Sequence, residues 1–333
     1  MKSIRFHLAL CLGLFCALNS SRGDDAANSF DGYWALTLPG GNAGWLGVES
    51  SGKKIKAQML WAWGSVFKLD GAHLDGDKLV LTRIHEDTVK KPDGHETTIK
   101  LTETITVTRN GDALKLMSVT PKADGNGEDR AEFTGKRLPP MPPAPDLSAV
   151  KFGEPVTLFD GKDLDGWRPV ETEAINGWSA HDGMLVNKQG EEGKEYANLR
   201  TVAEFEDFKL HAEVRIPKEG NSGIYLRGIY EVQVFDSFGK PLDSHNMGAI
   251  YSRLKPTVAA EKPAGEWQTL DITFVKRHVT VVLNGVKIID NQPVLGPTGG
   301  ALWPEVDRPG PIYLQGDHTG MEYRNIILTP VVG

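Results

Sequence analysis

Five side chains able to form hydrogen bonds recur along residues 221–237 (NSGIYLRGIYEVQVFDS): Asn221, Tyr225, Arg227, Glu231 and Gln233. The stretch has the apolar and polar alternation of two strands joined by a bend near position 228. Side chains two apart on a strand lie on one face, roughly 6.5–7 Å from each other. We therefore expect all five to share one surface. The competing interpretation is an ordinary solvated strand face, but such a face would more usually show Lys, Thr and Ser.

Composition places the chain among globular proteins and excludes several classes. Its 333 residues are enough for two domains, and 40% are hydrophobic and 24% charged. The net charge of −7 and the absence of any run of Lys and Arg argue against nucleic-acid binding. No Walker or dinucleotide-binding glycine motif is present, so a nicotinamide cofactor is not expected.

The first 23 residues have the pattern of a secretory signal peptide. Lys2 and Arg5 precede an apolar run over residues 8–18, and small residues lead to a cleavage position near Gly23. The run is too short to span a bilayer, and no other segment reaches 18 consecutive apolar residues. The sequence therefore predicts a periplasmic or secreted protein without a membrane span.

Both cysteines, Cys11 and Cys16, lie inside the apolar run of this signal. The mature chain is therefore expected to contain no disulfide, thiolate nucleophile or Cys–zinc site. A lipoprotein would need Cys16 as its acylated residue, and the preceding Phe15 is too large for that position.

Residues 30–137 show short alternating segments separated by Gly and Asn turns and no helical periodicity, which predicts a small antiparallel barrel or curved meander. Four tryptophans fall in this part of the chain: Trp34, Trp45, Trp61 and Trp63. They could line a groove for a sugar, but packing in the core or between domains is the favoured interpretation.

Residues 138–153 contain five prolines between positions 139 and 145, which is typical of an extended linker. Residues 154–333 again read as strands. Apolar residues alternate over Phe208–Ile216, and Asn284-Gly285 is the turn of a hairpin. About a dozen strands are expected, and they predict an all-β, two-sheet jelly-roll sandwich.

The second part also carries a series of motifs in a fixed order. They are Leu158-Phe159-Asp160-Gly161-Lys162, Gly166-Trp167, Asn221-Ser222-Gly223-Ile224-Tyr225-Leu226-Arg227, Tyr230-Glu231-Val232-Gln233, Gly248-Ala249-Ile250-Tyr251, Gly265-Glu266-Trp267, Ile312-Tyr313-Leu314-Gln315 and Tyr323-Arg324-Asn325-Ile326. By these motifs the chain resembles the 3-keto-disaccharide hydrolase domain family over residues 154–332. The resemblance implies a concanavalin A-like jelly roll, export, and action on glycosides oxidised to a ketone at sugar C3.

The residues around Glu231 can be compared with those that glycoside cleavage needs. Related laminarinase-type jelly rolls carry Glu-x-Asp-x-Glu on one strand, whereas here Glu231 is followed by Gln233 and Phe235. An ordinary retaining mechanism, which needs two carboxylates about 5–5.5 Å apart, therefore lacks its second acid on that strand. A 3-ketone acidifies the hydrogen on C2, so a single base can begin an elimination that water addition completes.

Each candidate residue is given a role on this basis. Glu231 is the expected base, Asp236 or His318 the proton donor, and the substrate-binding residues are Asn221, Tyr225, Arg227, Gln233, Gln315 and Arg324. Each also has a structural alternative. Arg227 and Glu231 could form a cross-strand ion pair, Asp236 could cap a turn, and His318 could be a solvated loop residue.

The metal requirement is left open. Asp236, Asp243, His245 and Asp317 offer oxygen and nitrogen ligands for a divalent cation but lack a metal-binding spacing such as H-x-H. The expected partner is an oligosaccharide or glycoside. The alternatives are a lectin-like binding protein without catalysis and, less favoured because carboxylates are missing, a glycosidase acting on unoxidised glucans.

Overall fold

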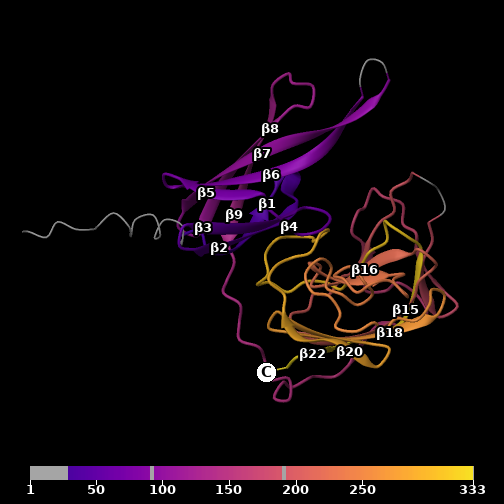
Figure 1. The fold of residues 1–333 in the computed structure, drawn as a ribbon. Coiled ribbons are helices and arrows are strands. Elements are labelled where there is room, and N and C mark those ends of the chain that lie inside the picture. Colours follow the sequence, from indigo (N-terminus) through magenta and orange to yellow (C-terminus); the bar gives the residue numbers. More distant parts are fainter. Residues whose placement is uncertain (1–28, 91–93, 190–192, 333) are drawn as a thin grey trace, which may run out of the picture.

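The computed structural model describes residues 29–90, 94–189 and 193–332 (Figure 1). The predicted signal peptide lies outside the described residues. Antiparallel strands form three sheets, and the one helical element is a 3-10 turn, η1 (Pro39–Gly41), within the described part of the chain. The all-β prediction is confirmed. In the described ranges no helix is long and apolar enough to cross a membrane.

The first sheet has nine strands in the order β4-β3-β2-β1-β9-β8-β7-β6-β5. Their bounds are β1 (Gly32–Thr37), β2 (Ala43–Ser51), β3 (Lys54–Trp61), β4 (Phe67–Lys68), β5 (Gly71–Asp75), β6 (Lys78–Lys90), β7 (Glu96–Asn110), β8 (Ala113–Pro121) and β9 (Glu128–Arg137). The sheet curls until β5 contacts β3, so of the two predicted forms, a small barrel or a curved meander, it approaches the barrel. Its interior is apolar and includes Trp34, Leu46 and Met59, all fully buried.

Residues 138–155 contain no strand and run beside the second part of the chain. Arg277 donates a hydrogen bond to the Pro139 carbonyl at 3.0 Å, and Asn291 donates to the Pro145 carbonyl at 3.0 Å. A proline-rich segment has few N–H groups for a ladder, so its carbonyls are met by side chains instead. The predicted linker is therefore fastened to the sandwich that follows it.

The second part of the chain is a two-sheet sandwich. Its eight-stranded sheet contains β10 (Val156–Phe159), β12 (Trp178–His181), β13 (Met184–Asn187), β15 (Phe208–Arg215), β18 (Trp267–Val275), β19 (His278–Leu283), β20 (Val286–Pro293) and β22 (Met321–Pro330). Its five-stranded sheet has the order β11 (Trp167–Pro169), β14 (Leu199–Thr201), β21 (Tyr313–Leu314), β16 (Asn221–Leu226) and β17 (Tyr230–Phe235).

The predicted alternation explains how the two sheets pack. Along β15, Phe208, Leu210, Ala212 and Val214 are buried, while the residues that alternate with them are exposed or partly exposed. Each buried side chain of this size contributes about 1.5–3 kcal/mol. Asn284 and Gly285 have positive φ angles of 51° and 80°, as the predicted hairpin turn between β19 and β20 requires.

The curled sheet rests on loops of the sandwich (Figure 1). Trp45 and Leu60 belong to the same apolar cluster as the sandwich core. The Arg253 guanidinium lies 4.2 Å from the centre of the Trp45 ring and donates to the Pro297 carbonyl. Of the four tryptophans, Trp34 and Trp45 are buried and Trp61 packs edge-on against Phe133, as expected, whereas Trp63 is 58% exposed.

Close backbone contact between the two parts generates a prediction for Gly299→Ala. A Cβ at position 299 would lie 2.4 Å from the Gly64 carbonyl oxygen, which is a backbone atom and not the end of a flexible side chain. We expect the free energy of unfolding to fall by about 1–3 kcal/mol, measured in urea, because the added methyl overpacks this contact. Gly71→Ala is the control, since its nearest atoms belong to the Thr82 side chain at 3.2 Å. Equal loss in both variants would contradict the prediction.

Candidate active site

The strand pair β16–β17 places alternating side chains on the outer face of the five-stranded sheet. Tyr225 is paired with Glu231, and Gly223 with Gln233. Residues paired directly across two strands share a face, so these groups and Asn221 point away from the sandwich core. The predicted common face is confirmed for four of its five side chains. It is buried, however, because Glu231 and Gln233 are each only 4% exposed.

Glycine at position 223 makes room for the carboxylate. A Cβ there would lie 2.3 Å from Glu231 Oε1, so the acid side chain extends across the neighbouring strand in the space that a larger residue would fill. The Glu231 backbone is held in place by a bond from its N–H to Thr298 Oγ1 at 2.9 Å. The carboxyl position is therefore determined by the sheet and by the loop that contains Thr298.

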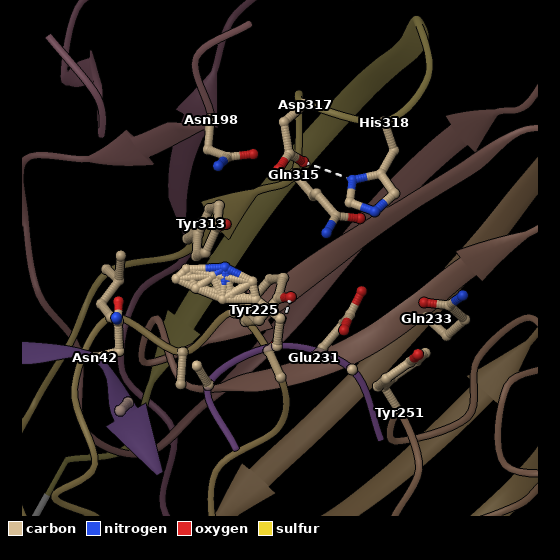
Figure 2. Close-up of a pocket in the computed structure, with 18 of the residues that line it drawn as sticks. Asn42, Asn198, Tyr225, Glu231, Gln233, Tyr251, Tyr313, Gln315, Asp317 and His318 are labelled. Carbon is tan, nitrogen blue, oxygen red and sulfur yellow. Dashed lines mark hydrogen bonds and ion pairs between the residues drawn. The ribbon is translucent and has the colours of Figure 1, made fainter. Parts of the chain in front are cut away.

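A pocket of about 440 Å³ lies over this face (Figure 2). That volume is within the range of about 300–1,000 Å³ found for small-molecule sites. Three groups of residues line it. From the five-stranded sheet and its loops come Asn198, Asn221, Tyr225, Glu231, Gln233, Tyr313, Gln315, Asp317 and His318; from other sandwich loops come Glu171, Tyr251, Gly299, Gly300, Ala301 and Leu302; from the curled sheet come Asn42, Ala43, Ala62, Trp63 and Gly64.

Glu231 is the buried acid of the pocket. Its pKa is raised from the ordinary 4.5 to about 8, mainly because it is buried; the Tyr225 hydroxyl lowers the pKa, and the negative charge of Asp317 adds to the rise. Tyr225 donates its own proton to the Gly299 carbonyl at 2.8 Å and stacks on Tyr313 with 4.3 Å between ring centres. The acid therefore lies beside two rigid aromatic rings and away from bulk water.

Asp317 and His318 form an ion pair on the wall above Glu231. Asp317 Oδ1 lies 2.7 Å from His318 Nδ1, as the dashed line in Figure 2 shows. This hydrogen bond raises the pKa of His318, and burial partly opposes the shift. Since both side chains remain partly exposed, the imidazole can exchange protons with solvent and present one to a ligand.

The loop that carries this ion pair is held by its glycine. Gly316 N–H donates to Asn198 Oδ1 at 2.7 Å, and its carbonyl accepts bonds from Asn187 at 2.9 Å and Gln189 at 2.6 Å. A Cβ on Gly316 would lie 2.5 Å from the Ala197 carbonyl oxygen. The position of His318 is therefore fixed by three side-chain bonds to one residue.

Two amides provide unused acceptors in the pocket. Gln233 donates to Asn221 Oδ1 at 3.1 Å, but its Oε1 and that of Gln315 are buried without a hydrogen-bond partner. A buried acceptor without a partner costs free energy, about 1–3 kcal/mol each. Hydroxyl groups of a ligand would satisfy both atoms, so this floor suits a polyhydroxylated molecule.

Six of the nine residues predicted for the site line the pocket: Asn221, Tyr225, Glu231, Gln233, Gln315 and His318. Arg227 does not. It lies in the turn between β16 and β17 with a positive φ of 54°, so its side chain leaves the alternation. Its guanidinium is buried against Asp207 Oδ1 at 2.8 Å and against two backbone carbonyls.

Asp236 and Arg324 also lie elsewhere. Asp236 follows the last residue of β17 and accepts a bond from Glu219 N–H at 2.9 Å, so it holds the turn before β16 and not the turn over residues 237–239 that the sequence suggested. Arg324 belongs to β22 in the other sheet and pairs with Glu213 at 2.6 Å. The structure therefore does not bring these two residues to Glu231.

Several lining residues were not predicted. Tyr313 alternates with apolar neighbours in the sequence, so that pattern could have identified it. Asn42 and Trp63 come from a separate sheet, and no local pattern connects them to Glu231. Within the described ranges no group of three or more His, Cys, Asp and Glu could hold a metal ion, so Asp236, Asp243, His245 and Asp317 do not form the suggested ligand set.

The raised pKa of Glu231 generates a prediction about stability. The folded protein keeps a proton on Glu231 that the unfolded chain releases above pH 4.5, so raising the pH from there through about 8 favours unfolding. Relative to Glu231→Gln, the wild type should lose stability over this range, by at most about 1.4 kcal/mol per pH unit. Urea unfolding at several pH values measures this. Glu266→Gln, an exposed change, is the control, and parallel curves for wild type and Glu231→Gln would refute the assignment.

Comparison with known proteins relates the second part of the chain to carbohydrate-active proteins. A protein of Bacteroides thetaiotaomicron named 3-keto-disaccharide hydrolase is 27% identical over 167 residues, covering 40% of this chain and 57% of that protein. The chain thus spans little more than half the length of this relative.

Solved structures give a looser likeness. Two candidate glycosyl hydrolases from Parabacteroides distasonis match with TM-scores of 0.43 and 0.40. They are 20% and 26% identical, and the matches cover 54% and 53% of this chain and 94% and 98% of theirs.

The family model described as the 3-keto-alpha-glucoside-1,2-lyase-like domain matches residues 154–329. This match covers more than half of the chain, includes every strand of the sandwich and contains the buried acid, the ion pair and the amide floor. The chain therefore belongs to the 3-keto-alpha-glucoside-1,2-lyase-like domain family.

Proposed function

We propose that the protein cleaves the glycosidic bond of disaccharides or glycosides whose sugar carries a ketone at C3. The observation that carries this proposal is Glu231, the one buried carboxyl among the residues that line the pocket, facing the Asp317–His318 ion pair over a floor of amides. The family match and the printed name of the Bacteroides relative support the same substrate class.

The reaction begins with proton transfer. With the 3-keto ring over the floor, the Glu231 carboxylate removes the C2 proton, and the electron pair becomes an enolate on the C3 oxygen. The amide groups of Gln233 and Gln315 and the Tyr313 hydroxyl line the same pocket, and in this proposal they donate hydrogen bonds to that oxygen or to the neighbouring hydroxyls. A carboxyl whose pKa lies near 8 is a stronger base than an exposed one once it has lost its proton.

Bond cleavage follows from the enolate. Its electrons form the C1–C2 double bond while the C1–O bond breaks, and protonated His318 donates a proton to the leaving oxygen. Water then adds to C1 of the enone and a proton returns to C2, so the sum is hydrolysis. Asp317 keeps His318 protonated over a wider pH range because their hydrogen bond raises the pKa of the imidazole.

Other carboxylates in the pocket are engaged elsewhere. Glu171 accepts bonds from the backbone N–H and the side-chain amide of Asn198, and Asp317 holds His318. The strand position two residues after Glu231 carries Gln233. These assignments favour elimination over double displacement, which needs a free nucleophilic carboxylate beside the acid.

The division of roles predicts different behaviour of two variants with 3-keto-trehalose in deuterated water. Glu231→Gln should lose C2 deuterium exchange and cleavage together, by roughly 10²–10⁴-fold, because the base is absent. His318→Gln should retain exchange at C2 while cleavage slows, because the proton donor acts later. Exchange is followed by NMR and cleavage by release of monosaccharide.

Glu266→Gln is the matched control and should behave as wild type, since its side chain is exposed and away from the pocket. Loss of exchange in His318→Gln with retention in Glu231→Gln would reverse the two roles. Binding of the sugar without turnover by the wild type would favour the lectin-like alternative and refute the enzymatic proposal. Equal cleavage of unoxidised trehalose would favour the ordinary glycosidase.

We further propose that the protein acts outside the cytoplasm. The sequence support is the charged start, the apolar run over residues 8–18 and the small residues that end at Gly23. Expression of the full chain in a bacterial host should give an exported product whose N-terminal residue is Asp24, measured by mass spectrometry of the periplasmic and medium fractions. Recovery of uncleaved chain in the cytoplasm alone would contradict this.

A further inference from the structure

The loop between β3 and β4 reaches from the curled sheet to the pocket of the sandwich. It is joined to two sandwich loops by three hydrogen bonds. These are Gly300 N–H to the Ala62 carbonyl at 3.0 Å, Ser65 Oγ to His245 Nε2 at 2.8 Å, and Val66 N–H to Ser252 Oγ at 2.7 Å. The loop is therefore bonded to the sandwich at its first residue, Ala62, and at its last two, Ser65 and Val66.

The backbone on both sides of Trp63 is constrained as well. Ala62 and Gly64 have positive φ angles of 54° and 76°, and the Gly64 backbone packs directly on Gly299. A non-glycine residue such as Ala62 adopts this conformation only where its surroundings determine it. The indole of Trp63 is thus carried by a rigid support.

Trp63 nevertheless exposes its ring. It is 58% exposed and lines the pocket whose floor holds the 4% exposed Glu231. It therefore lies at the rim, while the acid lies at the bottom. An apolar face held rigidly beside hydrogen-bonding groups matches the two-sided character of a pyranose ring, which has C–H groups on its faces and hydroxyls at its edge.

Asn42 adds a polar group from the same sheet. Its Nδ2 donates to the Pro39 carbonyl at 3.1 Å, which orients the amide and leaves the oxygen able to accept a hydroxyl proton. Figure 2 shows Asn42 and Gln233 at opposite sides of the labelled residues, with Tyr225 and Glu231 between them. The pocket thus extends beyond the position of the reacting ring toward the curled sheet.

We propose that Trp63 and Asn42 form a sugar-binding subsite for the second ring of a disaccharide, with the indole stacked on its C–H face. The assignment of the first ring to Glu231 rests on the proposed function. The curled sheet therefore takes part in substrate selection, and it favours disaccharides over glycosides with a small aglycone.

The kinetic test compares two substrates with the same reacting ring, 3-keto-trehalose and methyl 3-keto-α-glucoside. Trp63→Ala should raise KM for the disaccharide roughly 3- to 10-fold, the range expected for loss of an aromatic stack. KM for the methyl glycoside should not change. Trp63→Phe keeps an aromatic face and should restore most of the disaccharide affinity. Phe238→Ala, which removes an exposed aromatic ring that does not line the pocket, is the matched control.

Equal changes for both substrates, or no change for either, would overturn the subsite. A binding measurement separates this result from failure of the proposed function. Calorimetric titration with 3-keto-trehalose compares two proteins that lack the proposed base, the single variant Glu231→Gln and the double variant Glu231→Gln/Trp63→Ala. The double variant should bind the sugar more weakly. If the wild type cleaves neither substrate but this difference persists, the subsite stands and the proposed reaction falls. If the two proteins bind the disaccharide equally, or neither binds it, the subsite is refuted.

Discussion

Removal of one carboxyl group from water is the constraint on which the site depends. A buried carboxylate without a cation nearby is unfavourable, so Glu231 holds its proton until about pH 8. The burial has three sources: the strand pair beneath it, the loop that contains Gly299 and Gly300, and residues of the curled sheet. The same desolvation that destabilises the folded chain raises the pKa of Glu231, and the proposed removal of a proton from carbon relies on that raised basicity.

Glycines at the pocket let neighbouring segments lie close together, so Glu231 can be buried while space for a ligand remains. Three of the glycines at which a Cβ would lie within 2.5 Å of another atom are at the pocket: Gly223 beneath Glu231, Gly316 beside Ala197, and Gly299 against Gly64. At each of these positions the absence of a side chain lets the walls of the pocket pack closely and leaves the space inside it open. The sandwich core contributes indirectly, because the apolar alternation of β16 and β17 leaves only the opposite set of residues free to face the ligand.

The sequence identified the residues whose position follows from strand periodicity. Asn221, Tyr225, Glu231 and Gln233 share a face because a period of two persists along each strand. The prediction was wrong for Arg227 because the turn interrupts that period. It was wrong for Arg324 because a sequence motif does not reveal which of the two sheets its strand joins. The ion pair of Asp317 and His318 is adjacent in sequence, but its direction depends on bonds from distant side chains to Gly316.

Contacts between the curled sheet and the sandwich could not be predicted from local sequence patterns. The four tryptophans look alike in the sequence, yet Trp34 fills the curled sheet, Trp45 packs on Arg253 and Trp63 stands at the rim of the pocket. The family match begins at residue 154, so it carries no information about Trp63 or Asn42. The proposed reaction and the proposed subsite therefore rest on different parts of the chain: the reacting groups belong to the sandwich, while Trp63 and Asn42 come from the curled sheet and its loops.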